Sequence, residues 1–325
     1  MTLPRPRLVV LTAEGTPRPC NEAALQELAD VRWATAADLE PALRGADVLL
    51  SWDFLSTALR DAWGAADALR WVHVAAAGVD AMLFDALAES SVVLTNSRGV
   101  FDQPIAEFVL ASVLAHDKRL HESKDLQREH RWVHREVTRS AGQHVLVVGT
   151  GAIGRACGRL LQSVGLTVRG AGRREVTGDP DLGDIVLTSA LAEHVGWADH
   201  VVLTAPLTPE TRHVVSGAVL AAMKPTAHLI NVGRGALVDE TALVTALQAG
   251  EIAAASLDVV ETEPLPEASP LWDLPQVAIS AHMCGDVVGW RDELALLFED
   301  NLRRYVAGEA LLNQVDTRTG FPYRG

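Results

Sequence analysis

The stretch His144-Val-Leu-Val-Val-Gly149-Thr-Gly151-Ala-Ile-Gly154 decides the fold of this chain. Its apolar run is typical of a buried strand, and apolar residues recur at helical spacing after its glycines. In such a G-x-G-x-x-G turn, Gly149 permits the tight turn, Gly151 lets the backbone approach a pyrophosphate, and Gly154 lets helix and strand pack closely. The helix N-terminus offers free N–H groups to the phosphates. The stretch therefore predicts a dinucleotide-binding βα unit, in preference to a glycine-rich turn without a ligand.

The next predicted strand ends in a basic turn. An acidic residue about 20 residues further on would hold the ribose 2′-OH of NAD. Gly172 stands in that place, and Arg173 and Arg174 follow it. Two guanidinium groups suit a 2′-phosphate, so we expect NADP to be preferred over NAD. The alternative is a solvated basic turn.

Short apolar runs alternate with helical patterns along most of the chain, which predicts βαβ units and parallel sheets. In the first hundred residues we expect strands at Leu8–Leu11, Val48–Ser51, Trp71–Ala75 and Val92–Thr95, and helices at Asn21–Asp30 and Leu55–Ala62. A second series of strands is expected at His144–Val148, Thr167–Gly170, His200–Ala205, His228–Val232, Ala254–Val259 and Val277–Ser280. A long polar helix is expected from about Gln103 to His130, and a final amphipathic helix within Asp286–Gly308.

These patterns predict an α/β chain of two domains, each a doubly wound parallel sheet. Residues 1–99 together with 286–325 are expected to form a flavodoxin-like substrate-binding domain. Residues 100–285 are expected to form a Rossmann-type dinucleotide-binding domain, inserted into the first. The length of 325 residues fits two domains.

The composition excludes several classes of function. A net charge of -14 argues against binding to nucleic acid or to an anionic membrane, and it means that an anionic substrate needs a locally basic pocket. Cys20, Cys157 and Cys284 are too widely spaced for a disulfide framework or a zinc site, which indicates reduced thiols. No apolar stretch of about 18 residues predicts a transmembrane helix, and the N-terminus predicts a strand rather than a signal peptide. We expect a cytoplasmic protein without a bound metal.

Three polar residues follow successive predicted strands, where ligands bind in open α/β sheets. They are Arg234, Glu263 and His282. Reduction of a 2-oxo acid needs a cation for the carboxylate and carbonyl, and a protonated imidazole that gives a proton to the forming alkoxide. A neighbouring carboxylate would favour the charged imidazole. Each residue alone has a structural alternative: a surface ion pair, a solvated loop acid or a turn histidine. Their joint placement favours catalysis.

At these residues the chain resembles the D-isomer-specific 2-hydroxyacid dehydrogenase family. The resemblance extends over nearly the whole length. It rests on Ala75-Ala-Ala-Gly78-Val-Asp80, Asn96-Ser-Arg-Gly99-Val-Phe-Asp, Ile105-Ala-Glu107, the glycine turn, Ala205-Pro-Leu-Thr-Pro-Glu-Thr211, Asn231-Val-Gly-Arg-Gly235, Asp258-Val-Val-Glu-Thr-Glu-Pro264 and the His282 segment. The basic turn is similar to the NADP-preferring glyoxylate/hydroxypyruvate reductase branch.

The resemblance implies that small 2-oxo acids are reduced to D-2-hydroxy acids with NADPH or NADH. It implies the catalytic set Arg234, Glu263 and His282, and a substrate carboxylate held by backbone N–H groups of Ala77 and Gly78, with Arg234 and His282 also contacting substrate. It implies a homodimer joined largely through Gln103–Gln143 with Trp132, although Trp132 could be an ordinary core residue. The cofactor contacts that it implies, beyond the three glycines, Arg173 and Arg174, are Ala152, Ile153, Ala205, Pro206, Val232, Gly233, Arg234, Asp258 and His282.

The chain departs from the family near the histidine. Ala281 stands where the family usually has proline, and Met283-Cys284-Gly285-Asp286 replaces its usual small residues and threonine. This leaves the contacts on the nicotinamide side open. The first-domain residues that would contact the substrate side chain are mostly apolar, which indicates a small or hydrophobic side chain; they are Trp52, Phe54, Ala75–Gly78 and Phe101.

Two other functions remain compatible with the sequence. One is a non-enzymatic dinucleotide sensor or corepressor, because such proteins share this fold. The other is a phosphite or formate dehydrogenase of the same family. Phosphite dehydrogenases resemble this chain but have a lysine where Ala77 stands, and formate dehydrogenases usually have glutamine where Glu263 stands.

Overall fold

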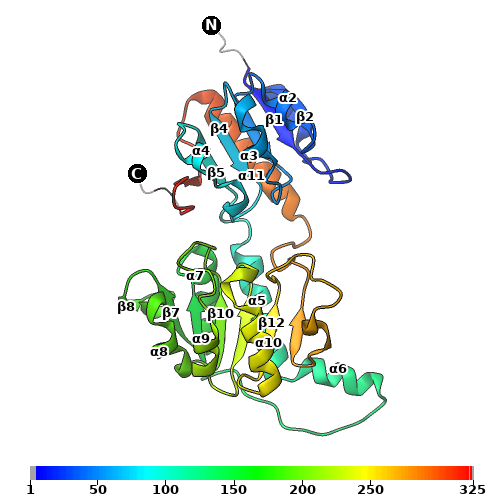
Figure 1. Cartoon of the computed structure of the whole chain (residues 1–325), viewed down its shortest axis with the longest axis vertical. Coiled ribbons are helices and arrows are strands. Elements are labelled where there is room, and N and C mark those ends of the chain that lie inside the picture. The colour runs from blue at the N-terminus through cyan, green and yellow to red at the C-terminus, as the bar shows by residue number, and fades with distance from the viewer. Residues whose placement is uncertain (1–4, 322, 324–325) are drawn as a thin grey trace. The chain divides into compact units, whose positions relative to one another are not determined.

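The computed structural model describes residues 5–321 and 323, and the chain divides into two compact units (Figure 1). Unit 1 contains the chain up to Phe101 and again from Val288 onward, and unit 2 contains Asp102–Val287. Each unit is a mainly parallel sheet with helices, which confirms the predicted α/β class. Nothing in the described part of the chain is both helical and apolar over a length that could cross a membrane.

The sheet of unit 1 has the strand order β14-β5-β4-β3-β1-β2. The strands are β1 Arg7–Leu11, β2 Asp30–Ala34, β3 Val48–Ser51, β4 Trp71–Val74, β5 Val93–Asn96 and β14 Gln314–Val315. All neighbours are parallel except β14, which runs antiparallel to β5. The order of the first five strands is that of flavodoxin-like sheets.

The helices of unit 1 cover a core of aliphatic side chains from these strands. They are α1 Glu22–Leu28, α2 Leu39–Leu43, α3 Ala58–Ala62, α4 Asp85–Ala88 and α11 Trp290–Ala307, with 3-10 turns at Trp63–Ala65 and Asp80–Met82. Helix α11 returns to the unit from the far end of the sequence and buries Leu294, Phe298 and Leu302 at helical spacing. It packs against α1 and stacks Phe298 on Trp71 of β4.

The sheet of unit 2 has the strand order β13-β12-β11-β10-β6-β7-β9-β8. The strands are β6 His144–Val148, β7 Thr167–Gly172, β8 Val176–Asp179, β9 Gly183–Leu187, β10 His200–Leu203, β11 His228–Asn231, β12 Ala254–Leu257 and β13 Val277–Ile279. Within the described residues, β8 runs antiparallel to β9, and all other neighbouring strands of this sheet are parallel. From β9 to β12 this is the Rossmann order, with its reversal point between β6 and β10.

The helices of unit 2 form two groups. Helix α7 packs against α5, whereas α8, α9 and α10 pack side by side in series. Right-handed crossovers in the two directions from β6 place these groups on opposite faces of the sheet. The helices are α5 Asp102–Asp117, α6 Leu120–Arg128, α7 Ala152–Ser163, α8 Leu191–His194, α9 Gly217–Ala222 and α10 Glu240–Ala249, and 3-10 turns lie at Thr188–Ala190, Val195–Trp197, Gly235–Leu237 and Pro270–Asp273.

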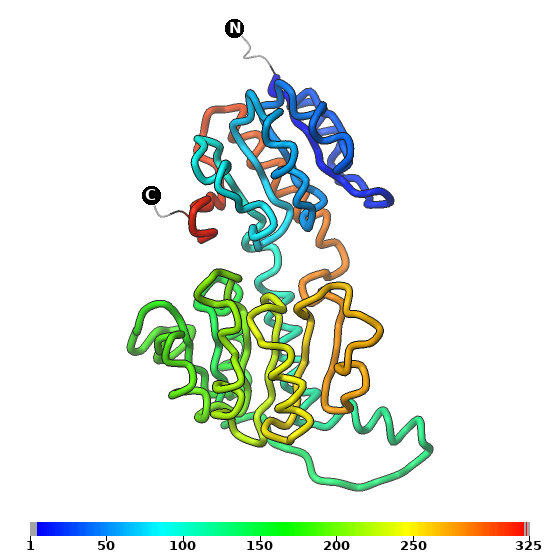
Figure 2. The backbone as a smooth tube through the Cα atoms, in the orientation of Figure 1, coloured from blue at the N-terminus to red at the C-terminus, as the bar shows by residue number. Residues whose placement is uncertain are grey.

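The expectation of one long polar helix from Gln103 to His130 is wrong. Helix α5 ends at Asp117 and α6 begins at Leu120, because Arg119 between them adopts a left-handed conformation with φ +50°. Helix α5 is also not polar, since Ile105, Val109 and Val113 are buried on its inner face. Helix α6 leads away from the sheet, and an extended segment after it, residues 129–143, returns to β6 (Figure 2).

Candidate active site

The glycine turn of unit 2 has the steric requirements that its sequence predicts. Gly149 has a φ of +116°, and a Cβ there would lie 2.6 Å from the backbone nitrogen of Ala205. A Cβ on Gly154 would lie 1.9 Å from the carbonyl oxygen of Gly149. Gly151, the N-cap of α7, has open space where its Cβ would be. The turn therefore leaves room for a ligand directly at the N-terminus of α7, as a pyrophosphate requires.

The turn is further held by Thr204, which the sequence reasoning did not single out. The single hydroxyl hydrogen of Thr204 is shared between the carbonyl oxygens of Val148, at 3.3 Å, and Gly149, at 3.1 Å. Thr204 follows β10, so the two strands at the reversal point of the sheet are joined here.

The end of β7 carries a glycine where an acidic side chain would bind a ribose, and a side chain there would require Thr150 to shift. A Cβ on Gly172 would lie 2.9 Å from Cγ2 of Thr150, inside the glycine turn. Arg173 and Arg174 follow directly, and both side chains are exposed. Two arginines therefore follow the end of β7 directly, and no acidic residue stands between them and the strand.

His282 and Glu263 are joined by a hydrogen bond between Nδ1 and Oε2 of 2.7 Å. The other carboxylate oxygen of Glu263 accepts from the backbone N–H of Val260 at 3.2 Å. This hydrogen bond with Glu263 raises the pKa of His282 above its ordinary value, although burial and the charge of Arg234 oppose the increase. Burial alone would raise the pKa of Glu263, but the hydrogen bond and charge of His282 lower it. The pair therefore favours an imidazolium beside a carboxylate.

The loop that carries His282 is held by Asp258. His282 itself has a φ of +51°, a left-handed conformation that is costly for a non-glycine residue. The backbone carbonyl of buried Asp258 accepts from the His282 N–H at 2.8 Å. Its carboxylate accepts from the Ser280 hydroxyl at 2.5 Å and from the backbone N–H groups of Met283 and Cys284 at 3.0 and 3.1 Å. Asp258 therefore fixes the residues on both sides of the histidine, and Ser280 is a contributor that the sequence reasoning missed.

Arg234 follows β11 and is half-buried. Asn231 spans its turn, because its side chain accepts from Gly233 N–H at 3.1 Å and donates to the Arg234 carbonyl at 2.9 Å. The guanidinium donates to the Gly233 carbonyl at 2.8 Å. Its charge lowers the pKa of both His282 and Glu263, so it lies within electrostatic reach of the pair. Unit 2 thus brings Arg234, Glu263 and His282 together beyond the ends of β11, β12 and β13.

The turn after β4, in unit 1, contains Ala77 and Gly78, both half-buried. Asn96 Nδ2 donates to the Ala77 carbonyl at 2.6 Å, and the Ser97 N–H donates to the Ala76 carbonyl at 2.9 Å. Within residues 5–321 and 323, the backbone N–H groups of Ala77 and Gly78 donate to no protein acceptor. Two such neighbouring N–H groups can bind one carboxylate.

Two of the apolar residues expected near the substrate side chain belong to an aromatic group in unit 1. Phe54 and Phe101 both contact Trp290, with ring centroids 6.1 and 6.0 Å apart. Trp52 is buried and its indole N–H donates to the Pro17 carbonyl at 2.8 Å. Trp290 was not predicted to join this group, because it lies almost 190 residues after Phe101 in the sequence, at the start of α11.

Comparison with known proteins agrees with this geometry. Residues 110–284, more than half of the chain, match the family described as D-isomer specific 2-hydroxyacid dehydrogenase, NAD binding domain. The chain belongs to this family. It is therefore an NAD(P)-dependent oxidoreductase of the 2-hydroxyacid dehydrogenase type.

Relatives within the family cover much of the chain. It is 35% identical to a glyoxylate/hydroxypyruvate reductase B of Pectobacterium carotovorum, over 76% of this chain and 79% of the relative. It is 31% identical to a D-3-phosphoglycerate dehydrogenase of Mycobacterium tuberculosis, over 98% of this chain but only 60% of that relative's length. A D-isomer specific 2-hydroxyacid dehydrogenase of Xanthobacter autotrophicus, solved in complex with NADPH and MES, has a TM-score of 0.82 and 34% identity, covering 97% of this chain and 100% of that one.

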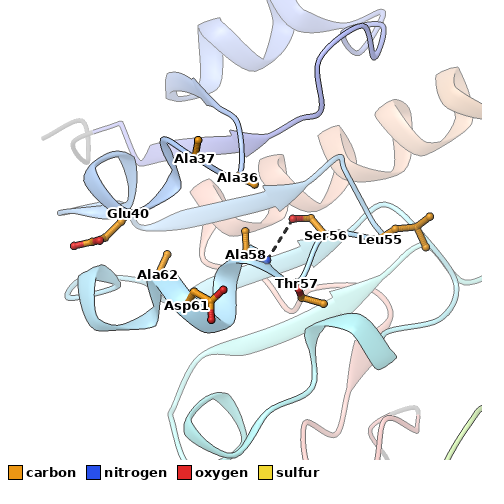
Figure 3. Close-up of a pocket in the computed structure, with 9 residues that line it drawn as sticks. All are labelled: Ala36, Ala37, Glu40, Leu55, Ser56, Thr57, Ala58, Asp61 and Ala62. Atoms are coloured by element: carbon orange, nitrogen blue, oxygen red, sulfur yellow. Dashed lines mark hydrogen bonds between the residues drawn. The ribbon is translucent and has the colours of Figure 1, made fainter.

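The dehydrogenase has a separate cavity of about 530 Å³ in unit 1, shown in Figure 3. It lies between the residues after β2 and the start of α3, and its lining includes the carboxylates of Glu40 and Asp61. None of the residues predicted to bind substrate or cofactor lines it. Two acidic side chains would repel an anionic 2-oxo acid, so we do not assign the substrate to this cavity.

The departures from the family sequence lie in the Asp258-held loop. Ala281 and Met283 are exposed, whereas Cys284 is buried. Burial, reinforced by the charge of Asp258, raises the pKa of the Cys284 thiol well above its ordinary value. Cys284 therefore stays neutral and serves as a small buried side chain beneath the loop.

Proposed function

We propose that this dehydrogenase reduces small 2-oxo acids such as glyoxylate or hydroxypyruvate to the D-2-hydroxy acid, with NADPH as the preferred donor. The observation that carries the proposal is the 2.7 Å hydrogen bond between His282 and Glu263, in the same unit as the glycine turn. A histidine held in its charged form by a carboxylate is the proton donor that such a reduction requires. The glyoxylate/hydroxypyruvate reductase of Pectobacterium supports the choice of substrate class.

Each site residue then has a distinct role. NADPH, when bound, supplies the hydride. Nδ1 of His282 is engaged with Glu263, so Nε2 is the atom that gives its proton to the substrate oxygen. Arg234 binds the carboxylate and polarises the carbonyl, because a guanidinium stabilises negative charge on both groups. The N–H groups of Ala77 and Gly78 bind the substrate carboxylate.

Unit 2 is proposed as the dinucleotide-binding domain, and unit 1 as the substrate-binding domain. In residue numbers, we assign 100–285 to the former and 1–99 with 286–325 to the latter. The cofactor contacts proposed in unit 2 follow the ends of its strands and the N-terminus of α7. They are Gly149, Gly151, Ala152, Ile153, Gly154, Arg173, Arg174, Ala205, Pro206, Val232, Gly233, Arg234, Asp258 and His282.

A panel of 2-oxo acids, assayed with NADPH and with NADH, tests the function. We expect glyoxylate and hydroxypyruvate to be reduced, and small apolar 2-oxo acids to compete with them because Trp52, Phe54 and Phe101 are apolar. Chiral analysis of the glycerate formed from hydroxypyruvate should give the D isomer, whereas the glycolate formed from glyoxylate is achiral. A chain that binds NADPH but reduces no member of the panel would be a dinucleotide sensor instead.

The NADPH preference has its own test in the basic turn after β7. Replacing both Arg173 and Arg174 with alanine removes two charge-assisted contacts to the 2′-phosphate, which cost about 3–5 kcal/mol at most. We expect NADPH binding to weaken far more than NADH binding, measured as the two dissociation constants. Arg159→Ala, in α7, is the matched control because Arg159 pairs with Asp181 at 3.2 Å. A wild-type chain that uses NADH better would contradict the preference.

A homodimer is proposed through residues 103–143. The Trp132 side chain is 100% exposed, with Val133 and Val137 also exposed, so Trp132 is not a core residue of this chain. The segment is held at its base, where Thr138 N–H donates to the Asp117 carbonyl at 2.9 Å. Light scattering should give twice the chain mass at micromolar concentration, and Trp132→Ala should weaken the association. A monomeric wild type would reject the proposal.

A cytoplasmic location is proposed from the cysteines. Cys20, Cys157 and Cys284 are all free thiols, as expected in a reducing compartment. Fractionation of the source cells should recover the chain with the cytoplasmic proteins.

A further inference from the structure

We propose that His73, Ser97 and Asn96 are positioning residues that hold the N–H groups of Ala77 and Gly78 ready for the substrate carboxylate. His73 lies in β4 and the other two lie at the end of β5 and just after it. The proposal deepens the proposed function, on which the identity of the carboxylate rests.

The hydrogen bonds of His73 have a fixed direction. The Ser97 hydroxyl donates its single hydrogen to the Val74 carbonyl at 3.0 Å, so Nε2 of His73, 3.2 Å from the same oxygen, must donate to it. A neutral imidazole has one N–H, so Nδ1 accepts from the Thr95 hydroxyl at 2.7 Å. Thr95 in turn accepts the indole N–H of Trp71 at 2.8 Å. One neutral tautomer therefore satisfies every member of this chain of hydrogen bonds.

This chain of hydrogen bonds is fully enclosed. His73, Thr95 and Ser97 have no exposed surface, and the rings of Trp71 and Phe298 lie 6.1 and 5.4 Å from the His73 ring. Burial lowers the pKa of His73 to about 3, so the ring stays neutral under ordinary conditions. A neutral imidazole serves here because it accepts on one side and donates on the other.

The consequence for the turn follows from the planarity of the peptide group. The Ala76 carbonyl and the Ala77 N–H belong to one trans peptide and point in opposite directions, as do the Ala77 carbonyl and the Gly78 N–H. The Ser97 N–H holds the first carbonyl at 2.9 Å, and Asn96 Nδ2 holds the second at 2.6 Å. Fixing both carbonyls toward β5 turns both N–H groups away from it. His73 contributes by fixing Ser97, and thereby the end of β4.

An ordinary core histidine would affect stability but not substrate affinity selectively, and four variants separate the two roles. His73→Leu removes the donor and the acceptor, and His73→Gln retains one of each without titrating. Ser97→Ala removes the hydroxyl that joins His73 to the Val74 carbonyl at the end of β4, and keeps the backbone N–H that binds the Ala76 carbonyl. Ser90→Ala is the matched control, because its hydroxyl also donates to a backbone carbonyl, that of Leu87 at 2.8 Å, but before β5.

Steady-state kinetics with glyoxylate at saturating NADPH give the first readout. We expect KM to rise about tenfold or more in His73→Leu and Ser97→Ala, because hydrogen bonds to a charged ligand are lost or misdirected. The NADPH dissociation constant and the thermal midpoint of Ser97→Ala should stay near wild type, and His73→Gln should recover most of the KM. An unchanged KM in folded Ser97→Ala, or equal losses in His73→Gln and His73→Leu, would overturn the proposal.

Amide NMR spectra of the full chain test the positioning without any turnover. The Ala77 and Gly78 amide signals should move or broaden in Ser97→Ala and stay in place in Ser90→Ala. Unmoved signals in Ser97→Ala would overturn the positioning role even if glyoxylate is reduced. Moved signals in a chain that reduces no 2-oxo acid would support the positioning role and reject only the proposed function.

Discussion

Two histidines show how the same side chain acquires opposite chemistry in the two units. His73, inside β4 of unit 1, is fully buried between the hydroxyl groups of Thr95 and Ser97. His282, in the loop after β13 of unit 2, is 33% exposed and bound to the carboxylate of Glu263. Burial lowers the pKa of the first to about 3, whereas the carboxylate raises the pKa of the second. The partners, rather than the residue type, decide whether a histidine acts as a neutral spacer or as an acid.

The largest expected effect comes from removing the acid. His282→Ala should lower the rate of 2-oxo acid reduction on the order of 10²–10⁴-fold, which is what proton transfer by a positioned group typically contributes. NADPH should still bind, because the glycine turn does not depend on the imidazole. His194→Ala, a half-buried histidine of α8, is the control. Full activity in His282→Ala would show that His282 is not the proton donor.

The second largest expected effect is on the pH dependence of stability, to which the neutral His73 contributes. The folded pKa of His73 is about 3, below the ordinary value of 6.5, so the unfolded state binds more protons between these values. The stability that His73 contributes is therefore complete above pH 6.5 and falls by about 1.4 kcal/mol for each pH unit below it. His73→Gln cannot titrate and should flatten this dependence.

Denaturant unfolding at pH 7, 6 and 5 gives the free energy of unfolding of wild type and of His73→Gln at each pH. The slope of this free energy against pH should be steeper in wild type. Other titrating groups, such as buried His228, are present in both proteins and cancel in the comparison. Parallel slopes would mean that His73 is not held neutral on folding.

The smallest effect sharpens the role of the carboxylate. Glu263→Gln retains the shape of the pair but removes the charge that raises the pKa of His282. In wild type, reduction should persist at low pH and fall as the pH rises through this raised pKa, while oxidation of the hydroxy acid rises over the same range. Both profiles should move to lower pH in the variant. Superimposable profiles would mean that Glu263 does not tune His282.

Local patterns were sufficient for much of the fold. The strand His144–Val148 was predicted with its observed bounds, and the other strands of its series were found within about two residues of their ends. The strand Asp30–Ala34 was missed because it lies at an edge and alternates charged with apolar residues rather than forming an apolar run. The hairpin of β8 and β9 was missed because Val176–Asp179 is mostly exposed and carries little apolar signal.

The sequence by itself determined the glycine turn, the alternation of strands and helices, and the polar residues that follow β11, β12 and β13. These features depend on backbone conformation and on the period of the apolar residues, and both are determined by residues that are close together in the sequence. Only the tertiary structure decided that Asn96 and Ser97 orient the turn after β4, that Asp258 holds the loop of His282, and that Trp290 joins Phe54. These contacts link residues about 20 to 240 positions apart, and they exist only once the register between strands and the return of α11 have placed donor and acceptor within hydrogen-bonding or packing distance.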